Sequence, residues 1–157
     1  MSTLFVDTIN EKTTNNGVYI PGHVLQAVTG TLSAGINTTS GTMAATGLKA
    51  TITPSTTSSK IYVAASMTLQ NGTANGGTNI ELYRKIGSAT AASIFKYGSV
   101  GLSQYAGSNN VSVGSLVYLD SPSTTSAIEY EIYYSRYSTG TAYLHSGPQI
   151  IAMEIGA

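Results

Sequence analysis

The sequence has no cysteine and no tryptophan, and only 9% of its 157 residues are charged. The lack of cysteine excludes a disulfide framework, a thiolate metal site and a cysteine nucleophile. Seven basic and seven acidic residues give a formal net charge of zero. The chain therefore has no basic surplus with which to bind nucleic acid. Copies with so little charge repel one another weakly, which favours fixing the chain in an assembly.

Long apolar runs are also missing from the sequence. None approaches the roughly 20 residues that a membrane-spanning helix needs, so we expect no membrane partner. Residues 1–7 have neither the basic start nor the apolar segment of a signal peptide. We therefore expect no secretory leader.

Small uncharged residues are abundant instead, with 22 Thr, 20 Ser and 17 Gly, and 11 of the 13 aromatic residues are Tyr. Apolar and polar residues alternate with a period of two, most clearly over Lys60–Gln70, which predicts half-buried strands. The other expected strands are 24–32, 48–53, 79–86, 93–99, 112–120, 128–134 and 151–155. Residues 71–77 are Gly-rich, but no helix pattern follows them, so they predict a hairpin loop and not a phosphate cradle.

About eight strands with Pro, Gly, Asn and Ser turns predict an all-β protein with an antiparallel β-sandwich, of the jelly-roll type. An immunoglobulin-like sandwich is the alternative, although the Cys and Trp hallmarks of antibody domains are absent. Residues 1–22 differ in composition and predict an extended N-terminal arm, followed by the sandwich domain at 23–157. We expect the arm to dock on a neighbouring subunit or on its own sheet. Its apolar anchoring side chains would be Leu4, Phe5, Val6, Ile9, Val18, Tyr19 and Ile20.

The residues that usually carry chemistry form no catalytic or metal motif. His23 and His145 have no second ligand at a metal-binding spacing, so they predict surface or turn histidines. Glu129 and Glu131 share one outward strand face, as charges on a solvated face commonly do, although such a pair could supply half of a glycosidase site. Asp120 precedes Ser-Pro-Ser and is expected to cap a turn and not to bind calcium. We expect no enzyme activity, no cofactor and no metal.

Tyrosines crowd into the segment 130–143. Tyr130 and Tyr134 fit the core face of the strand, whereas Tyr133 and Tyr137 point the other way. Tyrosine pairs neighbouring strands within a sheet, is enriched at protein interfaces and stacks on sugars. Cross-strand pairing, a subunit interface and a glycan site are therefore all open. The candidate interface residues are Tyr133, Tyr137 and Tyr143.

Several short motifs resemble those of virion structural proteins from tailed phages, especially phages of cyanobacteria and marine bacteria. The motifs are Val6-Asp7-Thr8-Ile9, Ile20-Pro21-Gly22-His23-Val24-Leu25-Gln26, Ile52-Thr53-Pro54-Ser55, Ser58-Ser59-Lys60-Ile61-Tyr62-Val63, Leu119-Asp120-Ser121-Pro122-Ser123-Thr124-Thr125 and Met153-Glu154-Ile155. The resemblance covers most of the chain but is thin between residues 70 and 112. It implies a β-sandwich on the surface of a phage particle, commonly a homotrimer, without catalytic residues.

Two roles follow from the resemblance. The first is a capsid decoration (cement) protein, whose arm binds the major capsid protein or other virion proteins. The second is the receptor-binding tip of a tail or head fibre, which would bind host surface glycans. The chain has no coiled-coil heptads, collagen-like repeat or repeating β-shaft with which a fibre bridges distance. The decoration role is therefore the preferred prediction.

Overall fold

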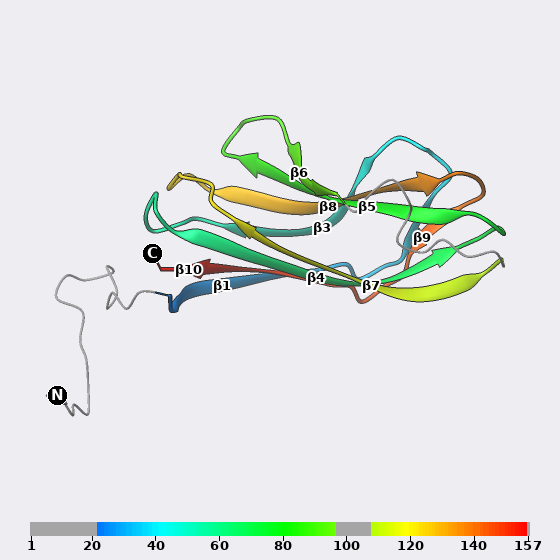
Figure 1. The fold of residues 1–157 in the computed structure, drawn as a ribbon, viewed down its shortest axis with the longest axis horizontal. Helices are drawn as coiled ribbons and strands as arrows, with labels where there is room; N and C mark the ends of the chain where they lie inside the picture. The colour runs from blue at the N-terminus through cyan, green and yellow to red at the C-terminus, as the bar shows by residue number, and fades with distance from the viewer. Residues whose placement is uncertain (1–21, 97–107, 157) are drawn as a thin grey trace, which may run out of the picture.

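The structure is a computed structural model that describes residues 22–96 and 108–156. This part of the chain contains ten strands and no helix (Figure 1), and hence no helix that could cross a membrane. The strands are β1 Val24–Thr31, β2 Ile36–Thr38, β3 Ala44–Ile52, β4 Lys60–Asn71, β5 Gly77–Ile86, β6 Ala92–Lys96, β7 Asn110–Asp120, β8 Ile128–Tyr137, β9 Ala142–Leu144 and β10 Gln149–Ile155.

The strands form two antiparallel sheets that pack face to face. Sheet A contains β1, β2, β4, β7, β9 and β10, and sheet B has the order β3-β8-β5-β6. In sheet A, β4 pairs with β7 along one edge and with β10 and then β9 along the other, while β1 and β2 lie outside β10 and β9. Figure 1 shows the two sheets as layers, with sheet A below sheet B.

The pairing of the strands is nested along the chain. The first strand pairs with the tenth, the second with the ninth, the third with the eighth, the fourth with the seventh and the fifth with the sixth. The chain is therefore one long antiparallel hairpin that has been rolled up. The contacts of β10 with β4 and of β8 with β5 close the roll. This connectivity is that of a jelly roll.

The core lies between the sheets and follows from the period-two pattern. The inward positions of β4 are fully or almost fully buried, and they face apolar positions of sheet B such as Leu48, Leu82 and Ile132. The buried apolar residues of β4 are Ile61, Val63, Ala65, Met67 and Leu69. Burial of such side chains contributes about 25 cal/mol per Å² of apolar surface and is the main stabilising term.

Most predicted strands are confirmed within one to four residues. Those at 60–70, 128–134 and 151–155 correspond to β4, β8 and β10, and the weaker ones correspond to β1, β3, β5, β6 and β7. The end of the strand expected at 93–99 lies outside the described residues. Two strands were not predicted, β2 and β9, because three residues are too short to show an alternation.

The hairpin predicted at residues 71–77 is wrong. The loop leaves β4 in sheet A and enters β5 in sheet B, so it crosses between the layers. Two features hold it in place: Asn75 adopts a left-handed backbone conformation with a φ of 60°, and the Gly72 N–H donates to the Thr141 carbonyl at 2.8 Å. A side chain at Gly76 would collide with the Thr73 and Thr139 carbonyls, so this glycine permits the tight connection between the sheets.

Gly30 closes the sandwich where β1 meets β3. A side chain at this position would overlap the backbone carbonyl of Lys49 on β3 and approach the side chain of Ile150. Backbone atoms cannot move aside as a flexible side chain can, so only glycine permits this close approach.

Candidate assembly surface

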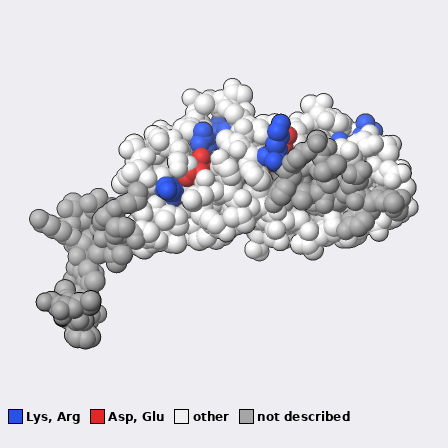
Figure 2. Space-filling view, in the orientation of Figure 1, with Lys and Arg blue, Asp and Glu red and all other residues white. Residues whose placement is uncertain are grey.

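The outer face of sheet A is almost free of charge and combines apolar rows with a polar row of Thr31, Gln149, Ser66 and Ser115. Thr29, Ile151, Ala64 and Val117 form a row across β1, β10, β4 and β7, and the next row is Ala27, Met153, Tyr62 and Leu119. Among the described Lys, Arg, Asp and Glu residues, only Lys60, at the start of β4, points to this face. In the edge-on view of Figure 2, the layer of sheet A is mostly white.

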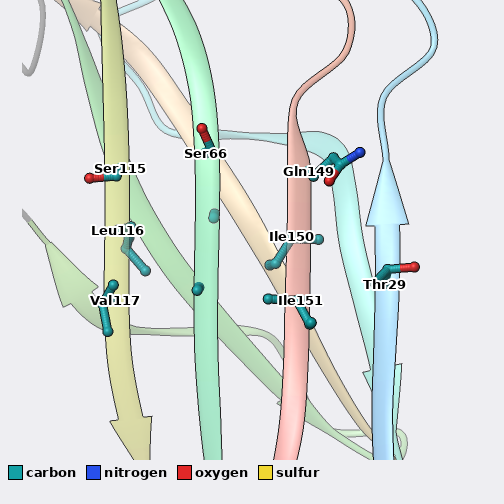
Figure 3. A pocket seen from close by; sticks show the side chains of 10 residues that line it. Thr29, Ser66, Ser115, Leu116, Val117, Gln149, Ile150 and Ile151 are labelled. Carbon is teal, nitrogen blue, oxygen red and sulfur yellow. The ribbon is translucent and has the colours of Figure 1, made fainter.

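Small side chains make a shallow hollow in the middle of this face. The hollow has a volume of about 350 Å³, and Ala64, Ser66, Ser115, Thr29 and Ile151 are among the residues that line it. Figure 3 shows β7, β4, β10 and β1 side by side beneath it. The hollow contains no charged group, so it suits an apolar side chain better than a polar ligand.

A ridge of exposed apolar side chains runs along β7, the edge strand beside the hollow. Val113 is 78% exposed, Val117 54% and Leu119 52%. These residues alternate with Gly114 and Leu116, which are buried against the core. The side of β7 with more apolar side chains therefore faces away from the core, and such a surface marks an interaction site.

The outer face of sheet B is different, because charged side chains gather on it (Figure 2). Tyr83 and Tyr133 stack there with ring centroids 3.8 Å apart and planes at 15°. The Lys49 ammonium lies 2.8 Å from the Glu129 carboxylate. The hydrogen bond to Glu129 and the negative charge of that carboxylate raise the pKa of Lys49. The charged residues of this face are Lys49, Glu81, Lys85, Lys96, Glu129 and Glu131.

The three predicted interface tyrosines do not share one face. Tyr133 belongs to sheet B, Tyr143 points outward from β9 in sheet A, and Tyr137 is the partly buried last residue of β8. Cross-strand aromatic stacking is confirmed for Tyr133, and the core positions are confirmed for Tyr130 and Tyr134. The residues predicted to anchor the arm lie outside the described part of the chain.

The residues with possible chemistry have structural partners. Glu131 accepts the Gly47 N–H at 2.8 Å, so both glutamates of β8 are engaged, Glu129 with Lys49. His145 Nε2 lies 2.8 Å from Gln70 Oε1. Within residues 22–96 and 108–156, no three His, Cys, Asp or Glu side chains are placed to hold a metal. The expectation that the chain is not an enzyme remains a prediction.

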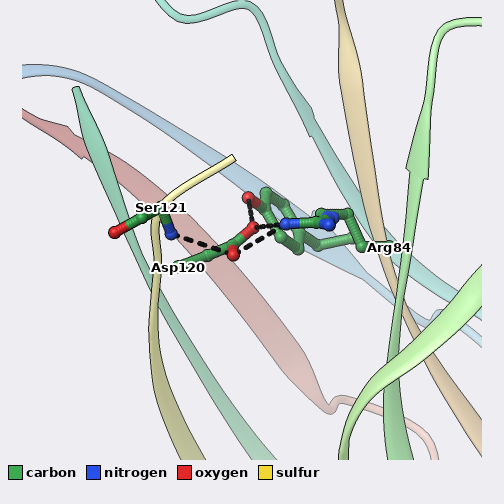
Figure 4. Close-up of polar contacts among 4 residues, drawn as sticks. Arg84, Asp120 and Ser121 are labelled. Carbon is green, nitrogen blue, oxygen red and sulfur yellow. Dashed lines mark hydrogen bonds and ion pairs between the residues drawn. The ribbon is translucent and has the colours of Figure 1, made fainter. Parts of the chain in front are cut away.

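A buried cluster of polar groups joins the sheets at Asp120 (Figure 4). Its carboxylate accepts two hydrogen bonds from Arg84 Nη1, at 2.8 and 2.9 Å, and one from the Tyr130 hydroxyl at 2.7 Å. Burial and this hydrogen bond raise the pKa of Tyr130. Asp120 also accepts the Ser121 N–H at 2.9 Å, a side-chain to backbone bond of the predicted kind, although residues 121–125 form no turn. Its ties to Arg84 and Tyr130 were not predicted.

Glu154 was missed by the sequence analysis. Its side chain is fully buried, and one carboxylate oxygen accepts hydrogen bonds from Ser55 N, Ser55 Oγ and Ser59 Oγ, at 2.6–2.7 Å. The other accepts a bond from Gln26 Nε2 at 2.6 Å. Burial raises the pKa of Glu154, but these hydrogen bonds outweigh it, so the net pKa is lowered. The sequence pattern pointed the other way, since Ile151, Met153 and Ile155 form the apolar series of this strand, whereas the structure turns Ile150, Ala152 and Glu154 inward.

Comparisons with known proteins agree on the fold. No protein-family model and no curated protein matches the chain. Solved structures do match. The chain is similar to the structure of infectious bursal disease virus Gt strain, with a TM-score of 0.50 and 13% identity over 81% of this chain and 32% of the other. The Gx strain structure gives a TM-score of 0.50 and 9% identity over 83% and 32%.

The chain is a jelly roll. The nested strand pairing and the viral structures agree on this, and the predicted all-β antiparallel sandwich is confirmed. The chain spans about a third of the length of the viral chains that it matches. A further match is Eiger TNF from S. frugiperda, with a TM-score of 0.47 and 6% identity over 82% of this chain and 91% of that one. At 9–13% identity, the likeness to the viral structures establishes the fold alone.

Proposed function

We propose that the chain is a non-enzymatic structural protein of a virion, a homotrimeric decoration protein on the capsid of a tailed phage. Residues 1–22 would bind the major capsid protein or another virion protein, and the jelly roll would project from the particle. The observation that carries the proposal is the difference between the two outer faces of the sandwich. One face is nearly uncharged and presents exposed apolar side chains along β7, and the other carries charged side chains that include the Lys49–Glu129 ion pair.

The fold supports this role by analogy. The viral structures to which the chain is similar share the jelly-roll architecture, and jelly rolls recur in viral capsid domains. A fold alone does not determine function, so the proposal depends on the chemical character of the two outer faces. A protein fixed permanently in an assembly can present an apolar face, whereas a free monomer rarely exposes a large one.

A receptor-binding fibre tip is the second candidate function. The observation that favours it is the Tyr83–Tyr133 stack on the outer face of sheet B, which lies beside Glu81 and Glu131. An aromatic ring beside a carboxylate suits a sugar. The ring packs on the apolar face of the sugar, and the carboxylate accepts hydrogen bonds from the hydroxyl groups of the sugar. In this role the chain would bind a host surface glycan and sheet B would face the host.

Immunogold electron microscopy of intact virions with an antibody against the chain separates the two functions. Label over the head supports decoration. Label confined to the tail or to fibre ends supports the fibre tip, and virions without label contradict both. Deletion of residues 1–22 provides the second arm of the test. Decoration predicts that the truncated chain no longer binds the shell, whereas a fibre tip predicts that binding to host cells survives the deletion.

A further inference from the structure

We propose that copies of this chain associate through the outer face of sheet A, with the ridge of one copy (Val113, Val117 and Leu119 on β7) packing on the same face of the next. The inference deepens the proposed function, because it assigns the surface that would form the homotrimer. It also assigns the opposite face, on sheet B, to solvent or to a receptor.

The ridge is the first observation that points to a protein partner. Val113, Val117 and Leu119 are each more than half exposed, and β7, of eleven residues, is an edge strand among the ten described strands. A long apolar edge strand is an aggregation hazard that proteins normally cover, shorten or break with charge. No Lys, Arg or Glu interrupts the outward positions of β7, and Asp120 at its end points inward. Coverage by another subunit removes the hazard.

The partner that covers this face must pack on an uncharged surface, and a second copy of the chain does so. Two like faces repel when they carry charge of one sign, but this face carries only Lys60, at its margin. The face also contains a projecting part and a hollow that complement each other, since the valines of the ridge lie beside the hollow lined by Ala64 and Ser66. Ridge and hollow on one surface allow each copy to receive the next.

The size of the face limits how much each contact can bury. Strands lie about 4.8 Å apart and rise about 3.4 Å per residue, so β1, β4, β7 and β10, of 8, 12, 11 and 7 residues, span about 620 Å². A standard interface buries about 800 Å² on each partner, and a trimer divides this face between two neighbours, so each contact is smaller than a standard interface. The tyrosine stack on sheet B has no part in this contact. Of the three candidate interface tyrosines, the proposal therefore retains only Tyr143, which points to the sheet A face.

The test is the mass of the full-length chain by size-exclusion chromatography with light scattering. The variant Val113→Glu/Val117→Glu adds two charges to the ridge, at positions that are exposed in a single copy. The control Ser88→Glu/Thr90→Glu adds the same charge to the exposed turn between β5 and β6. We expect trimers for the wild type and the control. For the ridge variant we expect association weakened by at least about 100-fold, because each charge would be desolvated at the contact.

A second measurement applies even if the ridge variant does not fold. The chain has no cysteine, so Ser66→Cys places one thiol in the hollow and Ser88→Cys places one in the distant turn. We expect a maleimide to label Ser88→Cys rapidly and to label Ser66→Cys only after dilution to monomers. Equal labelling of the two variants in the assembled protein would overturn the proposal.

The remaining outcomes separate this inference from the proposed function. A monomeric wild type, or a ridge variant with the mass of the wild type, overturns the surface assignment. In the first case, the arm or another protein must cover the face. A dimer that the ridge variant abolishes supports the surface but contradicts the trimer. An oligomer lost in the variant, together with virions that lack the chain, supports the surface and refutes the virion role.

Discussion

Asp120 on β7 accepts a hydrogen bond of 2.7 Å from the hydroxyl of Tyr130 on β8, so these two residues tie sheet A to sheet B. Arg84 on β5 completes the tie with two bonds to the same carboxylate. The three groups lie at the end of β7, where the ridge also ends. We therefore expect this cluster to fix the position of the edge strand that the assembly surface needs.

Asp120→Ala tests that tie. We expect a loss of about 3 kcal/mol in the free energy of unfolding, because the change leaves a buried hydroxyl and a mostly buried guanidinium without their acceptor. Tyr130→Phe removes one hydrogen bond and leaves the ion pair, so its loss is expected to be about 1 kcal/mol. Urea unfolding of the three proteins measures both effects. Equal stability of Asp120→Ala and the wild type would contradict the structural role.

The lowered pKa of Glu154 predicts how the stability of the fold depends on pH. Its pKa in the folded chain is lowered from the ordinary 4.5, so it stabilises the fold above about pH 4.5, and this contribution is lost as the pH falls through the lowered pKa. We expect little change in melting temperature between about pH 5 and 9 and a decline in more acidic solution.

Glu154→Gln is the matching variant. It places an amide among four hydrogen-bond donors, so we expect it to be about 2 kcal/mol less stable near neutral pH. Its stability should also decline less steeply in acid, because the group that titrates is gone. Thermal melts of both proteins from pH 3 to 8 provide the measurement. Parallel curves would show that Glu154 is not the group responsible.

Gly30→Ala tests the close approach of β1 to β3. The added methyl group would overlap the Lys49 carbonyl, so we expect a loss of about 3 kcal/mol or more, the usual range for overpacking. Gly41→Ala is the control, because nothing lies within 4 Å of its new side chain. Calorimetry of the two variants measures the difference. A Gly30→Ala protein as stable as the control would mean that β1 does not pack as described.

Tyr133→Ala separates the two outer faces. It removes the stack on Tyr83, so we expect about 1 kcal/mol less stability and an unchanged oligomer. If the fibre-tip role holds, glycan binding is lost with the stack and survives in Val113→Glu. A Tyr133→Ala protein that dissociates into monomers would place the interface on sheet B, against our assignment.

The sequence was sufficient to predict the sandwich because its longest strands alternate clearly. Over Ile61–Leu69 of β4 and Ile128–Tyr134 of β8 the inward positions are apolar without a break, and their burial follows from the pattern alone. The loop 71–77 was assigned wrongly, because a Gly-rich turn looks the same whether it joins neighbours in one sheet or crosses between two. The polar clusters were missed for a related reason, since Asp120 and Arg84 are 36 residues apart in the chain.

The assembly surface could be predicted from the sequence only in part. The alternation of Val113, Val117 and Leu119 predicts one apolar face for β7, but it cannot show which side of the strand meets the core. The structure places Leu116 inward and the valines outward. Only the packing of sheet B against sheet A decides that orientation, and it thereby decides which side of β7 is exposed.

Electron cryomicroscopy of the virion that carries this chain tests the account most directly. We expect density on the head for three jelly rolls around one axis, with β7 and the outer face of sheet A turned toward the neighbouring copies and sheet B turned to solvent. Density for single, separate jelly rolls, or contacts made through sheet B, would contradict the proposed assembly. Absence of the chain from the particle would contradict the virion role itself.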